Sequence, residues 1–143
     1  MKRILGVKVK FNTSSSSVYG ELGRYPLYIS RYMRIIKYWC KVSNSDNIIV
    51  KSVYTQGVID CERGYNNWVA SVKHILNSYG FGFAFYIPDH VNAKSFPINF
   101  KQRVIDNYIQ QWHVSIDNSP MLDFYKCFKN YFEYEKYLDM LPH

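Results

Sequence analysis

The chain has 143 residues, a length that fits one domain with a single core. Its hydrophobic content of 48%, with 14 Tyr and 9 Phe, excludes an intrinsically disordered segment. No apolar run approaches the roughly 20 residues of a transmembrane helix, and the opening MKRILGVKVKF is too short and too interrupted by Lys for a signal peptide. We therefore expect an intracellular protein without a membrane partner.

The net charge of +7 is concentrated in the first third of the chain. Residues 1–51 contain ten Lys and Arg against two acids, a net charge of +8, whereas residues 52–143 contain eight against nine, a net charge of −1. A charge excess confined to one part of the sequence favours a basic N-terminal third that contacts a polyanion, joined to a neutral, aromatic-rich helical body. A basic surface that is simply solvated is the alternative interpretation.

The N-terminal residues predict two helical segments separated by a polar break. Residues 1–7 have helical spacing but no preceding N-cap, which suggests the end of a longer helix that begins before the chain. Thr13 or Ser14 then provides an N-cap for a short helix that ends at Gly23, because glycine is favoured just after a helix C-terminus.

Pro26 is expected to open the next helix, since proline is tolerated in the first helical turn. At about 100° per residue, one arc of this helix is apolar and consists of Ile29, Met33, Ile36 and Cys40, with Tyr28, Tyr32 and Trp39 at its edge. The far side is basic and consists of Arg31, Arg34, Lys37 and Lys41. The pattern predicts a helix with one exposed basic face and one buried face. Tyr28, Tyr32 and Trp39 are expected to belong to the buried face, and the alternative role for them is as platforms on which bases stack.

Two more helices are predicted before a segment rich in phenylalanine. Residues 48–56 favour a short helix with Ile49 and Val53 facing inward. A second helix runs from Trp68 to a stop at Gly80. Residues 81–87 alternate Phe with other residues, which favours an apolar loop or one short extended segment.

Helical periodicity continues to the end of the chain. Apolar residues at helical spacing predict a long helix from Pro97 to Ile116. Two shorter apolar stripes follow, formed by Leu122, Tyr125, Phe128 and Phe132, and by Tyr137, Leu138 and Leu141. We therefore predict an all-α fold, an irregular bundle of about six helices in one domain over residues 1–143, with at most one extended segment near residues 81–87.

No catalytic centre is apparent in the sequence. The acids are scattered, so no pair of carboxylates converges as two-metal chemistry requires. The histidines and cysteines lack metal-ligand spacing, and we expect reduced, buried or half-buried thiols at Cys40, Cys61 and Cys127. Gly80 and Gly82 follow a helix instead of opening one, which is the wrong context for a phosphate-binding loop. We expect no catalytic residue, no metal site and no cofactor.

Several segments of the chain, taken in order, carry a resemblance to a known family. They are ILGVK, VYGELGRYPL, RIIKYW, NWVASVKHILNSYGFGFAF, VNAKSF, FKQRVIDNYIQQWHVSI and FYKCFKNYFEYEKYLDML. This series covers nearly the whole chain and resembles the region that follows the polymerase domain in animal LINE-type (non-LTR) retrotransposon proteins. The resemblance implies a fragment of a larger RNA-directed DNA polymerase, with endonuclease and polymerase domains upstream and a histidine- and cysteine-containing segment downstream.

The resemblance also implies a role for the basic helix. The chain is not expected to be an enzyme by itself, because the paired aspartates of the polymerase lie outside it. The region is expected near the polymerase thumb, where Lys and Arg can hold the phosphate backbone of template and primer. The implied partners are RNA, DNA or an RNA–DNA hybrid and the polymerase domain of the same element, in a ribonucleoprotein of the nucleus and cytoplasm.

Nine basic residues are the predicted nucleic-acid contacts, chosen by charge pattern alone. They are Lys2, Arg3, Lys8, Lys10, Arg24, Arg31, Arg34, Lys37 and Lys41. The alternative function is a protein-interaction or scaffold module that docks on an adjacent polymerase domain. A steep fall of nucleic-acid affinity with salt favours the first function, whereas an exposed apolar docking face favours the second.

Overall fold

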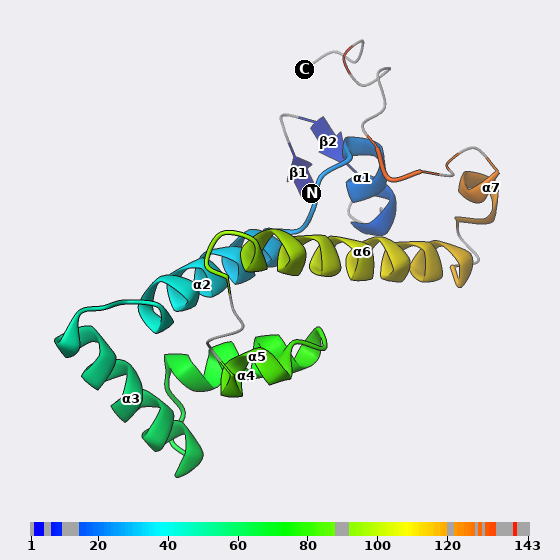
Figure 1. Cartoon of the computed structure of the whole chain (residues 1–143). Coiled ribbons are helices and arrows are strands. Elements are labelled where there is room, and N and C mark those ends of the chain that lie inside the picture. Colours follow the sequence, from blue (N-terminus) through cyan, green and yellow to red (C-terminus); the bar gives the residue numbers. More distant parts are fainter. Residues whose placement is uncertain are drawn as a thin grey trace. The chain divides into compact units, whose positions relative to one another are not determined.

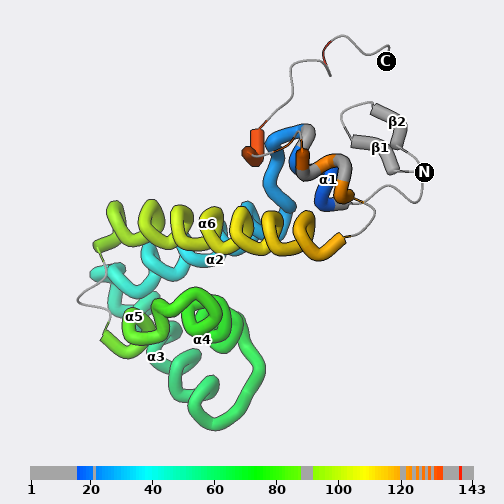
Figure 2. Tube along the Cα trace, turned by 90° about the vertical axis from the view of Figure 1, so that its right-hand side faces the viewer, coloured from blue at the N-terminus to red at the C-terminus, as the bar shows by residue number. Residues whose placement is uncertain are grey.

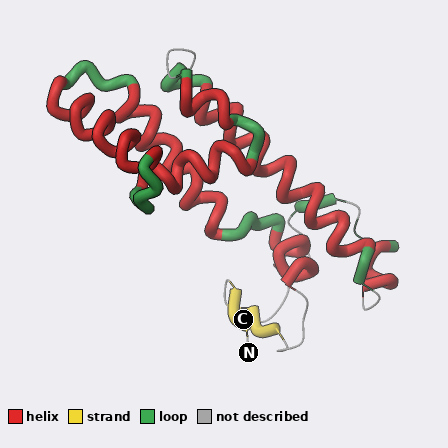
Figure 3. The backbone as a smooth tube through the Cα atoms, turned by 90° about the horizontal axis from the view of Figure 1, so that it is seen from below, coloured by secondary structure: helices red, strands yellow, loops and turns green. Residues whose placement is uncertain are grey.

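Helices dominate the structure of the chain (Figure 1). The computed structural model describes residues 2–4, 7–9, 15–87, 92–119, 122–127, 129, 131–133 and 139. Within these residues the elements follow in the order β1 (Lys2–Ile4), β2 (Val7–Val9), α1 (Ser15–Leu22), α2 (Leu27–Ser43), α3 (Ile48–Glu62), α4 (Trp68–Ser78), α5 (Gly82–Tyr86), α6 (Phe96–Asp117) and α7 (Asp123–Lys126). The prediction of an all-α protein with several helices is confirmed, and Figure 3 shows how little of the described backbone is extended.

Two compact units divide the chain. Unit 1 comprises residues 1–26 and 106–143, and unit 2 comprises residues 27–105. The charge boundary predicted at residue 51 falls within unit 2, inside α3. The description of residues 1–143 as one domain stays a prediction.

The N-terminal residues form strands instead of the predicted helix. β1 pairs with β2 in an antiparallel register that places Lys2 opposite Val9 and Arg3 opposite Lys8. The sequence VKV of β2 alternates apolar and charged residues with a period of two, and β-branched Val favours extended backbone. The helical interpretation of residues 1–7 was therefore wrong for the part that the structure describes.

Helix α1 ends where the sequence predicts. Gly23 adopts a left-handed φ of 56° directly after Leu22. The amide of Gly23 donates to the Gly20 carbonyl oxygen, and the amide of Arg24 donates to that of Tyr19, each at 3.3 Å. This pair of hydrogen bonds is a Schellman motif, which ends a helix by satisfying its last carbonyl groups. The predicted N-cap, Thr13 or Ser14, lies outside the described residues.

Trp112 joins α1 to the C-terminal part of α6 in unit 1. Its indole Nε1 donates to the Ser16 carbonyl oxygen at 2.7 Å, and the side chain is buried. A Cβ atom at Gly20 would lie 2.7 Å from Trp112 Cζ2, so only glycine allows this close approach. Phe132 packs edge-on to Trp112 at a centroid distance of 5.4 Å and stacks on Tyr25 at 5.1 Å.

Unit 2 has an aromatic and aliphatic core. Trp39 of α2 and Phe100 of α6 are fully buried, and Phe96 lies against both rings. Helix α4 adds the buried side chains of Val69, Val72, Ile75 and Leu76. Figure 2 shows α4 beside α3 and α5, which agrees with the contacts between these helices.

Helix α5 replaces the predicted loop or extended segment. Residues 82–86 form one short helix, in which Ala84 and Phe85 are buried while Phe83 is exposed. A helical turn brings Ala84 and Phe85 to the same side, whereas a strand would have grouped Phe83 with Phe85. The alternation of phenylalanines in the sequence therefore did not predict the helical conformation of this segment.

Helix α3 presents a different face from the one predicted. Ile49 and Val53, expected to face inward, are 74% and 64% exposed, and none of the residues of α3 is fully buried. The inward side carries Val50, Tyr54, Gly57, Val58 and Cys61, all partly buried. A Cβ at Gly57 would lie 2.9 Å from Val69 Cγ2, so the missing side chain lets α4 approach at this point. This close approach turns Ile49 and Val53 outward.

The long predicted helix of the C-terminal part is confirmed, and the described residues of the stripe that follows it are helical over a shorter stretch than predicted. The helix expected from Pro97 to Ile116 is confirmed as α6, with Phe100, Val104, Trp112 and Ile116 buried. Helix α7 has four residues, and the predicted stripe residues Phe128, Tyr137, Leu138 and Leu141 lie outside the described residues. Among the described helices, each is too short or too polar to cross a bilayer.

We predict that Gly57→Ala destabilises unit 2. Alanine normally stabilises a helix by about 1 kcal/mol relative to glycine, but here its methyl group collides with the fully buried Val69. Overpacking costs typically 1–3 kcal/mol, so the net loss in the free energy of unfolding is expected to be about 1 kcal/mol. Urea unfolding followed by tryptophan fluorescence measures it.

The matched control is Ser52→Ala on the exposed side of the same helix, which is expected to change stability by less than about 0.5 kcal/mol. A stabilised Gly57→Ala protein would contradict the close packing of α3 on α4.

Candidate nucleic-acid interface

Helix α2 separates an apolar face from a basic face. It begins directly after Pro26, and its buried residues are Ile29, Met33, Ile36, Trp39, Cys40 and Val42. Its four predicted contact residues, Arg31, Arg34, Lys37 and Lys41, are all exposed. The sequence of α2 contains no Asp or Glu, so no acid within the helix neutralises this basic face.

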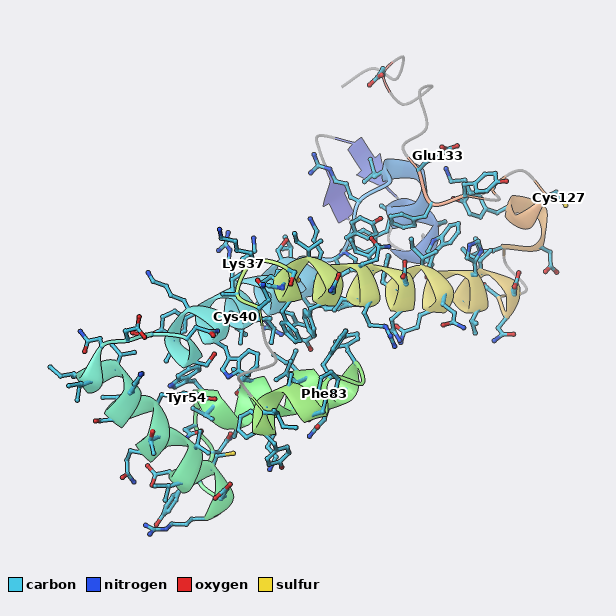
Figure 4. All side chains as sticks on the ribbon, in the orientation of Figure 1. Lys37, Cys40, Tyr54, Phe83, Cys127 and Glu133 are labelled. Carbon is cyan, nitrogen blue, oxygen red and sulfur yellow. The ribbon has the colours of Figure 1, made fainter. Side chains whose placement is uncertain are left out.

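Trp39 fixes the rotation of α2 about its axis. The side chain is 0% exposed, and its Nε1 donates to the Tyr54 hydroxyl oxygen of α3 at 3.0 Å. The indole also packs edge-on against Phe96 at a centroid distance of 5.9 Å. Because Trp39 is held on two sides, Lys37 and Lys41 are directed to the surface of unit 2, as Figure 4 shows for Lys37.

The other predicted contact residues belong to unit 1. Arg24 is exposed and follows α1. Lys2 and Arg3 lie in β1 and Lys8 in β2, where the register places Arg3 opposite Lys8. Lys10 lies outside the described residues. The structure therefore gathers four of the nine predicted residues on one helix face, the basic face of α2.

Unit 2 carries most of the net positive charge, although the contrast between the two units is smaller than that between residues 1–51 and 52–143. Residues 27–105 contain ten Lys and Arg against four acids, a net charge of +6, whereas unit 1 contains eight against seven, a net charge of +1. Lys51, Arg63, Lys94, Lys101 and Arg103 of unit 2 are exposed and add to its positive potential. Lys101 and Arg103 of α6 belong to unit 2 although they come late in the chain, which the sequence alone did not indicate.

A groove lies between α2 and α4 in unit 2. It has a volume of about 460 Å³ and is lined on the α2 side by Arg31, Tyr32 and Ile35 and on the α4 side by Asn66, Ser71 and His74, among others. The Arg31 guanidinium lies 5.7 Å from the centroid of the Tyr32 ring, within the range of a cation–π interaction. Arg31 therefore belongs both to the basic face and to the wall of the groove.

Aromatic pairs mark the two ends of the contact between α2 and α4. Tyr38 near the end of α2 meets Trp68 at the start of α4 with ring centroids 5.4 Å apart. Tyr32 in the first half of α2 meets Tyr79 after α4 at 6.3 Å. The two helices are therefore antiparallel along the groove.

Two exposed aromatic side chains were missed by the sequence analysis. Tyr38 is 58% exposed and Trp68 is 39% exposed. Tyr38 lies four residues after Arg34 and three before Lys41, so its place on the basic face could have been read from helical spacing. Trp68 is the first residue of α4, where the helix was predicted to begin. It follows the N-cap Asn67, whose Oδ1 accepts from the Ala70 amide at 2.9 Å.

The cysteines and the other residues of metal-ligand type are not grouped into a metal site in the described part of the chain. Among the described residues, no three or more His, Cys, Asp and Glu side chains are grouped to hold a metal ion. The three cysteines are free, and Cys40 is buried and Cys61 half-buried as predicted. Cys127 is exposed, contrary to the prediction, and directly follows α7. Burial raises the pKa of the Cys40 thiol from 9.0 to about 11, so it is protonated at neutral pH.

Comparison with protein-family models, with curated proteins and with solved structures gave no match in any of the three. The relationship to LINE-type retrotransposon proteins, inferred from the sequence segments, thus stays a prediction. The features that bear on function are the basic face of α2, the groove between α2 and α4, and the exposed side of α3.

We predict that Cys40 lowers the stability of unit 2 at high pH. The thiol ionises near pH 9.0 in the unfolded chain but only near 11 in the folded chain, so the folded state binds more protons between these values. The free energy of unfolding is therefore unaffected by Cys40 below about pH 9 and falls as the pH rises towards 11. Urea unfolding at pH 8, 9.5 and 10.5 measures the decline.

Cys40→Ala is expected to make this alkaline decline shallower, although the raised pKa values of Tyr28, Tyr54 and Tyr79, caused mainly by burial, leave a residual decline. Cys127→Ala, which removes an exposed thiol, serves as the control and should decline as the unchanged protein does. An equally steep decline in Cys40→Ala would show that Cys40 ionises normally in the folded state.

Proposed function

We propose that this chain is a non-catalytic, nucleic-acid-binding helical region of a LINE-type retrotransposon reverse transcriptase, which grips the template–primer backbone through α2. The observation that supports the proposal is the basic face of α2. Four cations are exposed on one side of a helix whose other side is buried, and the helix contains no acid.

The dimensions of the basic face suit a phosphate backbone. Arg31 and Lys41 are ten residues apart, which is about 15 Å along the helix axis at a rise of 1.5 Å per residue. One strand of a duplex carries a phosphate about every 3.4 Å along its axis, so the face covers about four phosphate steps. Such contacts position a nucleic acid without reading its sequence.

Arginine and lysine are expected to make different contacts on this face. Arg31 and Arg34 present planar guanidinium groups that can form two hydrogen bonds to one phosphate. Lys37 and Lys41 act as compact point charges on flexible stems. The arginines lie in the first half of α2 and the lysines in the second, so we expect the more geometrically defined contacts at the end that borders the groove.

Within the proposal, catalysis belongs to the rest of the retrotransposon protein. The chain itself holds substrate, with RNA, DNA or an RNA–DNA hybrid as the ligand and the polymerase domain of the same element as the protein partner. The corresponding location is a ribonucleoprotein in the nucleus and cytoplasm. The segment series from ILGVK to FYKCFKNYFEYEKYLDML supports this assignment by resemblance.

A second candidate function is a scaffold module that docks on an adjacent polymerase domain. The specific observation in its favour is the outer side of α3, where Ile48, Ile49 and Val53 are exposed. Exposed aliphatic side chains gathered on one helix are typical of protein-interaction sites. The two functions are compatible if α2 holds nucleic acid while α3 contacts protein.

We predict that the chain binds a labelled RNA–DNA hybrid with a steep dependence on salt. If four phosphates are neutralised, log K should fall with log salt at a slope of about −3 to −4. Reversing the charges of Arg31, Arg34, Lys37 and Lys41 to Glu should abolish the binding. Fluorescence anisotropy across a salt series measures both quantities.

The matched control reverses four other exposed cations of unit 2, Lys51, Arg63, Lys94 and Lys101, which changes the net charge by the same amount. The control should weaken binding far less, because only general attraction is lost. Equal losses in both variants would contradict a specific role of α2. If the folded wild-type chain binds no nucleic acid, the scaffold function remains. In that case the triple variant Ile48→Ser, Ile49→Ser and Val53→Ser should abolish docking on the adjacent polymerase domain.

A further inference from the structure

The groove between α2 and α4 offers a second kind of contact to the strand that the basic face holds. We propose that this groove binds an unpaired base, so that the preferred ligand is a nucleic acid with a single-stranded segment. The inference rests on the proposed function, because the phosphates of the same strand would lie on α2. Arg31 links the two, since it lies on the basic face and lines the groove.

The groove has the size and the chemistry for one nucleotide. Its volume of about 460 Å³ lies in the range of roughly 300–1,000 Å³ that is usual for small-ligand sites. The half-buried ring of Tyr32 provides an aromatic surface for a base. Asn66, Ser71 and His74 supply hydrogen-bond donors and acceptors on the opposite wall.

The charge of the groove fits an anionic strand. No Asp or Glu is among the residues that line it, and the Arg31 guanidinium lies over the Tyr32 ring, 5.7 Å from its centroid. A phosphate at Arg31 would thus place the attached base next to an aromatic face. Backbone contacts to cations together with bases stacked on aromatic side chains are how proteins hold single strands.

The aromatic pair at one end of the groove extends the stacking surface. Tyr38 lies three residues after Ile35 of the groove wall, and its ring meets that of Trp68. Both rings are partly exposed, so a neighbouring base can reach them without any rearrangement of the core. Exposed aromatic side chains beside cations are more typical of strand binding than of a solvated helix face.

Base pairing would prevent this mode of binding. A base in a duplex is stacked and paired, so it exposes only its edges and must be unstacked before it can enter a pocket. The groove is far too small for a duplex. A template overhang, a gap or a melted primer end would therefore be the bound part of a template–primer.

The test compares a single-stranded oligonucleotide with a hairpin duplex of the same number of phosphates, for the wild-type chain and for Ser71→Phe. The phenylalanine fills the groove without changing charge. The wild-type chain should bind the single strand about tenfold more tightly, and Ser71→Phe should lose this preference while it keeps its affinity for the duplex. The control Ser52→Phe makes the same change on the outer side of α3 and should keep the preference.

Tryptophan fluorescence gives an independent readout. Trp39 and Trp112 are buried and Trp68 is partly exposed, so a base stacked near the groove quenches Trp68 selectively. Single strands should quench the wild-type chain, and duplexes should not. Equal affinity for both ligands, or a preference that survives Ser71→Phe, would overturn the inference while leaving backbone binding by α2 intact. Binding to neither ligand would instead refute the proposed function.

Discussion

The burial of Trp39 is the constraint on which the basic face of α2 depends. Its indole is enclosed by Phe96 and hydrogen-bonded to Tyr54, which leaves α2 one rotation about its own axis. Each residue turns a helix by about 100°, so a different buried residue would carry the cations towards the core. The cost of burying Arg or Lys without a partner makes that alternative arrangement unfavourable. A single core contact therefore places the positive charge of α2 in solvent.

The second constraint is the close approach of α3 and α4. Gly57 gives Val69 room to pack, and the Asn67 side chain donates to the Gly57 carbonyl oxygen at 2.9 Å while it caps α4. The start of α4 is thus fixed on α3, and Trp68 comes to lie against Tyr38 of α2. The walls of the groove follow from this placement, since α4 then runs antiparallel to α2.

Local patterns in the sequence predicted the elements better than their orientations. Both faces of α2 could be predicted, because its apolar and basic residues follow the helical period without conflict. The outward turn of Ile49 and Val53 could not, because it depends on Gly57 meeting Val69 from another helix. The groove could not be predicted from the sequence either, because it exists only where α2 and α4, which are separated by α3 in the sequence, lie side by side. The N-terminal strands and α5 were missed because short segments fit more than one period.

The parts of the candidate site that depend on neighbouring residues in the sequence could be predicted, and the parts that depend on packing between helices could not. Arg31, Arg34, Lys37 and Lys41 could be grouped from spacing alone. Trp68 and the remaining exposed cations of unit 2 required the fold, because their positions come from packing between helices. The described surface of unit 2 combines exposed cations with exposed aromatic rings, and the proposed contact with nucleic acid rests on this combination.

Ultraviolet cross-linking of the full chain to a template–primer with a single-stranded overhang, followed by peptide mapping, tests the central claim most directly. The account predicts adducts in two segments, Leu27–Ser43 of α2 and residues 66–78, which include α4. It predicts none on the outer side of α3. Adducts confined to α3 or to unit 1, or a folded chain that forms no adduct, would contradict the assignment of α2 and its groove as the nucleic-acid interface.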